Sequence, residues 1–179
     1  RDDDDRPARR ETMDFVDYLN SGVQFYTLAS RSTVNQPLDL CGKTVGTSRS
    51  TAFPAEIKTW SDANCMAAGK PAITVEGTSD NAAARAQLKQ ERFEGGAQGS
   101  ETVPYAMTLE PGVYKPLGAP FGGAQQGIAF AKADTQLRDA VLVAFKKLIA
   151  DGTYASIVAK WKLQASAVKQ AAVNGVAVP

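Results

Sequence analysis

The sequence predicts an α/β fold with a parallel sheet, and three observations support this prediction. Segments rich in β-forming residues alternate along the chain with segments that carry apolar residues at helical spacing. Such alternation is typical of parallel strands joined by right-handed helical crossovers. The chain has 179 residues, of which 44% are hydrophobic, enough to build one sizeable domain or two small lobes that bury roughly 70% of the unfolded surface.

The first half of the chain carries the clearest alternation. Strands are expected at Val23–Ala29, Lys43–Thr47 and Ala72–Glu76, because these stretches are rich in β-formers. A helix is expected at Phe53–Ala68, where apolar residues recur at helical spacing and a proline stands in the first turn. A further helix follows with Asp80 as its N-cap.

The second half begins with a weak strand and ends with two helices. Phe93–Gln98 contains two glycines, and Ser100 then suits the N-cap of a short helix. Gly127–Ala131 is a better strand, and Asp134 opens a long helix. An apolar stripe is expected on that helix at Leu137, Val141, Phe145 and Leu148. Gly152 ends it, and the next helix, capped by Thr153, is expected to bury Tyr154, Ile157, Val158 and Trp161.

Composition excludes several classes of function. Twenty basic residues stand against nineteen acidic ones, and the formal net charge is +1 with the signs interspersed, so nucleic acid is a poor candidate partner. The chain has no histidine and two cysteines, which removes histidine-dependent triads and the common zinc sites. Binding is therefore the leading class, and we assign no catalytic residue, no metal and no cofactor. An enzyme that uses paired carboxylates or a lysine, or that holds a cofactor through backbone groups, stays open at this point. The acidic run Asp2–Asp5 is expected to be a solvated, frayed end.

Three segments resemble the polar amino-acid solute-binding proteins of ABC importers. They are ARRETMDFVDYLNSG (8–22), DLCGKTVGTSRST (39–51) and GIAFAKADTQLRDAVLVAFKKLIADGTYASIVAKW (127–161). The resemblance implies a type 2 periplasmic binding protein, a two-lobe Venus-flytrap with ligand bound in the cleft between the lobes. Members of the family begin well before the RRETMDF region, so lobe one is expected to be incomplete in this chain.

The same resemblance implies a division of the chain into four parts. Residues 1–29 would be a tail and a remnant of lobe one with the first hinge strand, and residues 30–121 would form lobe two. Residues 122–133 would be the second hinge strand, and residues 134–179 would supply the C-terminal helices of lobe one.

The resemblance also implies a set of ligand-binding residues. Arg9 matches the arginine that binds the ligand carboxylate in the family; the alternative is a solvated surface charge. Ser48, Ser50 and Thr51 lie between a strand and a helix start, where free amides receive anions, although Ser50 could simply cap the helix.

For the ligand ammonium group, many relatives use an aspartate whose place is taken here by Gly99. Glu101 is the nearest acid, and it either substitutes for that aspartate or only favours a helix start. Gln98 could contact a polar ligand side chain or serve as an ordinary loop hydrogen-bonding group. Cys41 and Cys65 resemble a cysteine pair of the family, which implies a disulfide and an oxidising compartment; two buried free thiols are the alternative.

The function implied is binding of a polar amino acid outside the cytoplasm and its delivery to an ABC transporter permease. The location would be periplasmic, or secreted and membrane-anchored through a lipid. Two alternatives remain at this point. One is a dehydratase-like enzyme on the same scaffold, with Glu101 as general acid. The other is a truncated fragment that associates with itself through exposed sheet edges.

Overall fold

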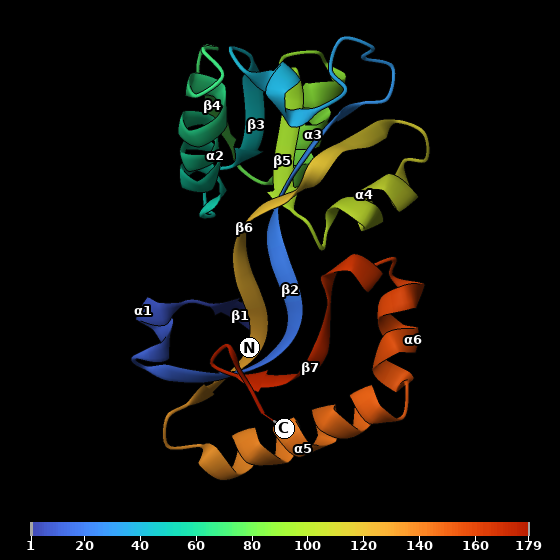
Figure 1. Cartoon of the computed structure of the whole chain (residues 1–179). Coiled ribbons are helices and arrows are strands. Elements are labelled where there is room, and N and C mark those ends of the chain that lie inside the picture. The colour runs from blue at the N-terminus through green and yellow to red at the C-terminus, as the bar shows by residue number, and fades with distance from the viewer. Residues whose placement is uncertain (1, 179) are drawn as a thin grey trace. The chain divides into compact units, whose positions relative to one another are not determined.

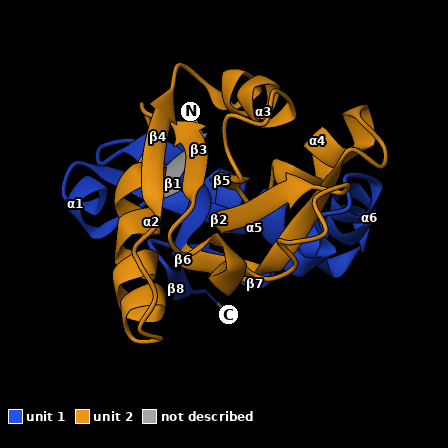
Figure 2. Ribbon diagram, turned by 90° about the horizontal axis from the view of Figure 1, so that it is seen from above, with its two compact units in different colours: residues 1–21, 123–179 blue, residues 22–122 orange. Residues whose placement is uncertain are grey.

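The structure is a computed structural model that describes residues 2–178, with side chains described from Asp5 onward (Figure 1). The chain divides into two compact units, drawn in different colours in Figure 2. Unit 1 is Arg1–Ser21 with Gly123–Pro179, and unit 2 is Gly22–Gly122. Two long strands, β2 (Met13–Leu28) and β6 (Tyr114–Ala131), contain residues of both units.

Unit 2 contains the parallel sheet that the sequence predicts. β3 (Thr44–Ser48) lies between β4 (Thr74–Thr78) and β5 (Gly95–Gly99) and runs parallel to both. The last part of β2 pairs antiparallel with β5, so that Val23 faces Gly99. The strands predicted at 43–47, 72–76 and 93–98 are therefore confirmed, with shifts of one or two residues at their ends. The strand predicted at Val23–Ala29 is only the last part of β2, which begins ten residues earlier, at Met13.

The helices of unit 2 agree with the sequence prediction except near Ser100 and at η1, which was not predicted. They are η1 (Pro37–Leu40), α2 (Phe53–Ser61), the π-helical turn η2 (Asp62–Met66), α3 (Asn81–Lys89) and α4 (Val103–Leu109). Asp80 caps α3 as predicted, since its Oδ1 accepts the Ala83 N–H at 2.7 Å. The prediction that Ser100 caps α4 is wrong: α4 begins after Thr102, and the Ser100 hydroxyl instead accepts the Gly22 N–H.

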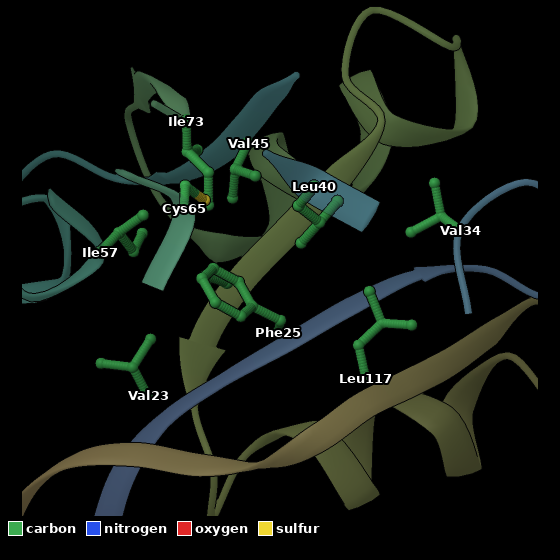
Figure 3. Close-up of a cluster of buried hydrophobic side chains, with 10 residues drawn as sticks. Val23, Phe25, Val34, Leu40, Val45, Ile57, Cys65, Ile73 and Leu117 are labelled. Carbon is green, nitrogen blue, oxygen red and sulfur yellow. The ribbon is translucent and has the colours of Figure 1, made fainter. Parts of the chain in front are cut away.

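Unit 2 has an apolar core on each face of its sheet, because neighbouring residues of a strand point to opposite sides. Phe25 lies in the core under α2, which Figure 3 shows, and Tyr26 lies in the core under α3 and α4. The first core contains Val23, Phe25, Val34, Leu40, Val45, Ile57, Cys65, Ile73, Ala97 and Leu117. Trp60 packs against Phe25 in this core.

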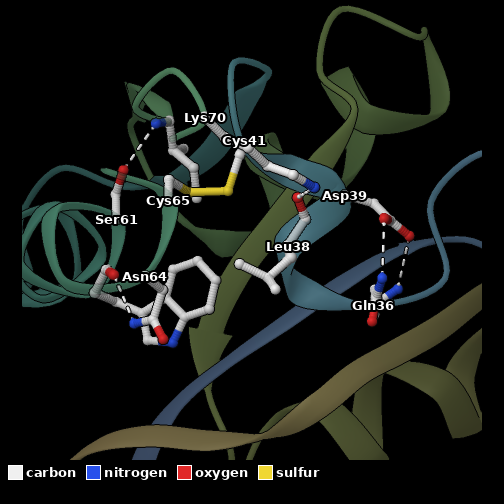
Figure 4. The surroundings of a disulfide bond; sticks show 10 residues. Gln36, Leu38, Asp39, Cys41, Ser61, Asn64, Cys65 and Lys70 are labelled. Atoms are coloured by element: carbon white, nitrogen blue, oxygen red, sulfur yellow. Dashed lines mark hydrogen bonds between the residues drawn. A yellow bond between two sulfur atoms is a disulfide. The ribbon is translucent and has the colours of Figure 1, made fainter. Parts of the chain in front are cut away.

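The disulfide that the resemblance implied is present. Cys41 follows η1 and Cys65 lies in η2, with their Cα atoms 5.5 Å apart (Figure 4). Lys70 donates from Nζ to the Leu38 carbonyl beside the bridge. The bond therefore links the start of β3 to the end of the α2–η2 helix within unit 2.

Unit 1 combines antiparallel strands with helices. Its elements are β1 (Asp2–Asp5), α1 (Pro7–Arg10), the first part of β2, the last part of β6, α5 (Thr135–Ala150), α6 (Thr153–Lys160), η3 (Gln164–Ser166), β7 (Ala167–Val173) and β8 (Val176–Ala177). β6 pairs with β1 and with β2, β2 pairs with β7, and β7 pairs with β8. Phe145, Tyr154 and Val158 fill the core under the helices.

Two sequence predictions are wrong in unit 1, and its C-terminal part holds elements that the sequence did not indicate. The acidic run is not a frayed end but a strand, because its backbone pairs with β6 and the Asp5 carboxylate binds Arg10. α5 buries Leu142 and Phe145, whereas Leu137 is 58% exposed. Residues 134–179 hold strands β7 and β8 as well as helices, because the segment after α6 pairs with β2.

The buried face of α6 also differs from the prediction. Tyr154 and Val158 are buried, but Ile157 and Trp161 are half exposed, so the stripe of α6 is narrower than expected. Among the helices of residues 2–178, none combines the length and the apolar character that a bilayer crossing requires. The same residues contain no group of three or more acids or cysteines positioned to hold a metal ion.

Candidate functional site

The turn between β3 and α2 brings three predicted ligand-binding residues together. Ser48 ends β3 and is buried, and its Oγ lies 3.2 Å from the Ser50 Oγ. The Thr51 hydroxyl donates to the Ser48 carbonyl at 2.9 Å and accepts the Phe53 N–H at 3.2 Å. Ser50 therefore does not act as the helix cap; Ala52 holds the cap position, and Thr51 organises the turn.

This turn has the chemistry of an anion site. The first N–H groups of a helix lack intrahelical partners, and the helix dipole makes that end positive. Ser50 and Thr51 are exposed beside it. Arg49, which we did not propose as a ligand-binding residue from the sequence, adds a guanidinium. Its Nε donates a hydrogen bond to the Thr78 carbonyl at the end of β4. The turn can therefore receive a carboxylate.

Glu101 follows the carboxyl end of β5, the strand next to β3. Because β3 and β5 are parallel neighbours, their carboxyl ends lie at one edge of the unit 2 sheet. A Cβ at Gly99 would overlap the Glu101 carboxylate, so that carboxylate packs directly against the Gly99 backbone. An acidic group thus occupies the space beside the position where relatives are expected to carry an aspartate.

Gln98 is almost fully buried, and both ends of its amide have partners within unit 2. Its Oε1 accepts from Arg85 Nη1 at 3.1 Å, and its Nε2 donates to Thr102 Oγ1 at 3.0 Å. Arg85 and Thr102 come from α3 and from the start of α4, so Gln98 ties both helices to β5. This arrangement matches the alternative reading of Gln98 as a structural hydrogen-bonding group.

Arg9 lies in unit 1, apart in sequence from the other five predicted residues. It is half-buried in the single turn of α1, and its carbonyl accepts the Thr12 N–H at 3.1 Å. Its neighbour Arg10 forms a two-point ion pair with Asp5, from Nε to Oδ1 at 2.6 Å and from Nη2 to Oδ2 at 2.9 Å. This ion pair therefore connects β1, which contains Asp5, to α1, which contains Arg10.

Sequence reasoning missed two buried aspartates on β2. The signal was available, because Asp14 and Asp17 interrupt the otherwise apolar run MDFVDYL. Lys132, Asn174 and Arg138 hold the Asp14 carboxylate, and the Lys132 hydrogen bond is the main reason that its pKa falls to about 2. Burial raises the pKa of Asp17 to about 7.

A surface cavity of about 510 Å³ opens within unit 1, beside the ion pair of Asp5 and Arg10. Its walls come from β1, α1, the hairpin of β7 and β8, and the parts of β2 and β6 that belong to unit 1. The lining residues are Asp5, Pro7, Arg10, Asn20, Ser21, Gly123, Ala124, Gln125, Asn174, Gly175 and Val176.

Comparison with known proteins gives a family match over most of the chain. The model of the bacterial extracellular solute-binding proteins, family 3, matches residues 4–164. The arginine-binding protein ArgT of Corynebacterium glutamicum is 32% identical over 172 residues, which are 95% of this chain and 56% of ArgT. The chain thus spans little more than half the length of this curated relative.

Solved structures show the same fold. The probable amino-acid ABC transporter extracellular-binding protein YtmK of Bacillus subtilis superposes with a TM-score of 0.75 at 23% identity, over 89% of this chain and 68% of YtmK. A putative L-cystine ABC transporter protein of Listeria monocytogenes superposes with a TM-score of 0.65 at 25% identity, over 93% of this chain and 70% of the Listeria chain. The mixed α/β fold is that of the type 2 periplasmic binding proteins, and these relatives are solute-binding proteins rather than enzymes.

Proposed function

Because the chain belongs to family 3 of the bacterial extracellular solute-binding proteins, we propose that it binds a polar amino acid and delivers it to an ABC transporter permease. The observation that carries this proposal is the hydroxyl-lined turn of Ser48, Ser50 and Thr51 at the start of α2. A dehydratase-like activity has no support, since the matched relatives are not enzymes.

In this proposal the amides at the start of α2 and the guanidinium of Arg9 bind the α-carboxylate. Thr51 keeps the turn in shape through its two hydrogen bonds, so the helix amides are pre-organised. A guanidinium suits a carboxylate because it donates two parallel hydrogen bonds. Hydrogen bonds to charged groups contribute roughly 1.5–3 kcal/mol each.

Glu101 binds the ammonium group. Gly99 leaves room for the Glu101 carboxylate at the end of β5, at the same sheet edge as the Ser48–Thr51 turn. The proximity of an acid and an anion-binding helix start suits a zwitterion, whose two charges are close together. Gln98 supports this end of β5 through Arg85 and Thr102.

Arginine is the first ligand to test, because the curated relative bears the name arginine-binding protein. An extracytoplasmic location agrees with the family's description and with the disulfide, since such bonds persist in oxidising compartments. Attachment to a membrane through a lipid belongs to the same proposal.

The test is calorimetry of the chain with a panel of amino acids, arginine, glutamine and cystine included. Thr51→Val should weaken binding about tenfold, because the turn loses both side-chain hydrogen bonds. Thr59→Val is the matched control, because the Thr59 hydroxyl donates to the Ala55 carbonyl within the same helix, and this variant should leave affinity unchanged. Heat from no amino acid would refute the proposal, as would equal affinities of the two variants.

A further inference from the structure

Two carboxylates and one guanidinium meet in the interior of unit 1. The Asp5 side chain is fully buried, Asp17 is fully buried, and the Arg10 side chain is one third exposed. Arg10 engages both oxygens of Asp5. On the far side, Asp17 Oδ2 accepts the Gly175 N–H at 2.7 Å.

The second oxygen of Asp17 has no donor among the described groups, although it is buried. Asp5 lies within hydrogen-bonding reach of the Asp17 side chain. Two ionised carboxylates in contact would repel each other, and a buried acceptor without a donor costs free energy. One proton resolves both problems, because a protonated Asp17 donates to Asp5 while Asp5 keeps its charge for Arg10.

We propose that Asp5 and Asp17 share one proton, and that this proton locks β1 to α1 and makes Arg10 a positioning residue for Arg9. The part of the inference that concerns Arg9 rests on the proposed function. Arg9 touches the ligand in that proposal, and Arg10 acts only through the segment that carries Arg9.

The charged groups around Asp17 favour this arrangement. β1 contributes Asp5 and α1 contributes Arg10, while the turn between β7 and β8 contributes the Gly175 N–H. β6 brings Gly127 against Asp17, where a Cβ would lie 2.9 Å from Oδ1. Asp14, also on β2, has its own cations, Lys132 and Arg138.

Gly175 contacts both Asp17 and Arg10 and is part of the same cluster. Its φ of +75° is one that side-chain-bearing residues rarely adopt, and a Cβ there would lie 2.6 Å from Arg10 Nη2. The backbone of the β7–β8 turn can therefore reach Asp17 while the guanidinium packs over it. Arg10 and Asp5 also line the cavity of about 510 Å³, which gives water access to the ion pair.

The consequence is a dependence on pH near neutrality. Burial is the main cause, and the neighbouring Asp5 adds to it, so that the pKa of Asp17 is raised to about 7 from its usual value near 4. When the segment opens, Asp17 reaches water and regains its ordinary pKa. The closed form therefore keeps a proton that the open form releases between about pH 4 and pH 7, so its stability falls as pH rises across that window.

The experiment is hydrogen exchange of the backbone amides of residues 3–12, corrected for intrinsic rates, between pH 5 and pH 8.5. Linkage predicts that protection of these amides falls by up to tenfold per pH unit from pH 5 to pH 7 and is constant above pH 7.5. A wild-type profile that is flat from pH 5 to pH 7 would overturn the proposal, whatever the variants do.

Asp17→Asn should abolish the pH dependence, because its amide keeps a donor toward Asp5 and an acceptor for the Gly175 N–H at every pH. Asp14→Asn is the matched control on the same strand; Lys132 holds the pKa of Asp14 at about 2, so this variant should keep the wild-type slope between pH 5 and pH 7. If Asp17→Asn retains that slope, the shared proton is disproved.

The positioning role has its own readout. A saturating amino acid that binds through Arg9 should raise the protection of residues 3–12 at pH 7.5 at least severalfold, and it should do so less in Asp17→Asn. Bound ligand without any such increase would refute positioning by Arg10. If no amino acid binds, the proposed function fails together with the positioning role, while the pH profile still decides the shared proton.

Discussion

Removing the Cys41–Cys65 disulfide should destabilise unit 2 by an amount that follows from its sequence separation. The two cysteines are 24 residues apart, and the chain-entropy model assigns about 3.5 kcal/mol at 25 °C to a closed loop of that length. We choose Cys41→Ala with Cys65→Ala, because Cys65 is fully buried and a serine hydroxyl there would add an unrelated cost.

Tryptophan fluorescence during urea unfolding measures this change. The chain has two tryptophans, Trp60 in unit 2 and Trp161 in unit 1. Trp60 packs against Phe25, with ring centroids 5.1 Å apart, so its emission reports the unit 2 core. In a Trp161→Phe background, the double alanine variant should lose about 3.5 kcal/mol of unfolding free energy. Its urea slope should not fall, because the unfolded chain without the bridge is less compact and exposes more surface.

The control is reduction. A thiol reductant should lower the stability of the wild-type protein to a similar extent and should leave the double alanine variant unchanged. A loss of less than about 1 kcal/mol would show that the entropy of the 24-residue loop does not govern unit 2 stability. An unchanged wild-type protein under reductant, with the bond shown to be open, would refute the reasoning in the same way.

Two further predictions concern unit 1. Tyr154→Phe should lower the free energy of unfolding by about 1–3 kcal/mol, because the Tyr154 hydroxyl donates to the Tyr18 carbonyl at 2.7 Å and accepts the Val168 N–H at 2.9 Å. Without the hydroxyl, this carbonyl and this N–H lose their hydrogen-bond partner. Thermal unfolding followed by circular dichroism measures the loss, and an unshifted midpoint would contradict it. The pKa of Asp14 is lowered to about 2, so its contribution of about 2 kcal/mol is present above pH 4 and lost as pH falls to 2; acid titration should show this decline in the wild type, and an equally steep decline in Asp14→Asn would exclude Asp14 as its source.

The parallel sheet of unit 2 could be predicted because its signals are local. β-formers mark β3, and Asp80 starts α3 with a side-chain cap that needs only the next three residues. The disulfide followed from a likeness to relatives and not from spacing alone. At the candidate site, the Ser48–Thr51 turn was predictable for the same local reason, since a strand end and a helix start adjoin it.

Other site features depend on partners far along the chain. Glu101 could be named from the sequence, but only the structure shows its carboxylate against Gly99. The sequence left Gln98 open between a ligand contact and a hydrogen-bonding group, and only the structure shows its amide bonded to Arg85 of α3. Such pairings arise from tertiary packing, which hydrophobic periodicity does not report.

The sequence by itself determined the class of fold, the family and the order of the elements in unit 2, because propensity, capping and motif similarity act over short stretches of chain. Only the tertiary structure showed that the acidic run Asp2–Asp5 forms a strand paired with β6. Asp5 is buried as part of a strand because Arg10 neutralises it and β6 pairs with its backbone, and Asp17 is buried beside Gly175, 158 residues away in sequence. Burial of a charge depends on which groups surround it in space, and no local pattern encodes that neighbourhood.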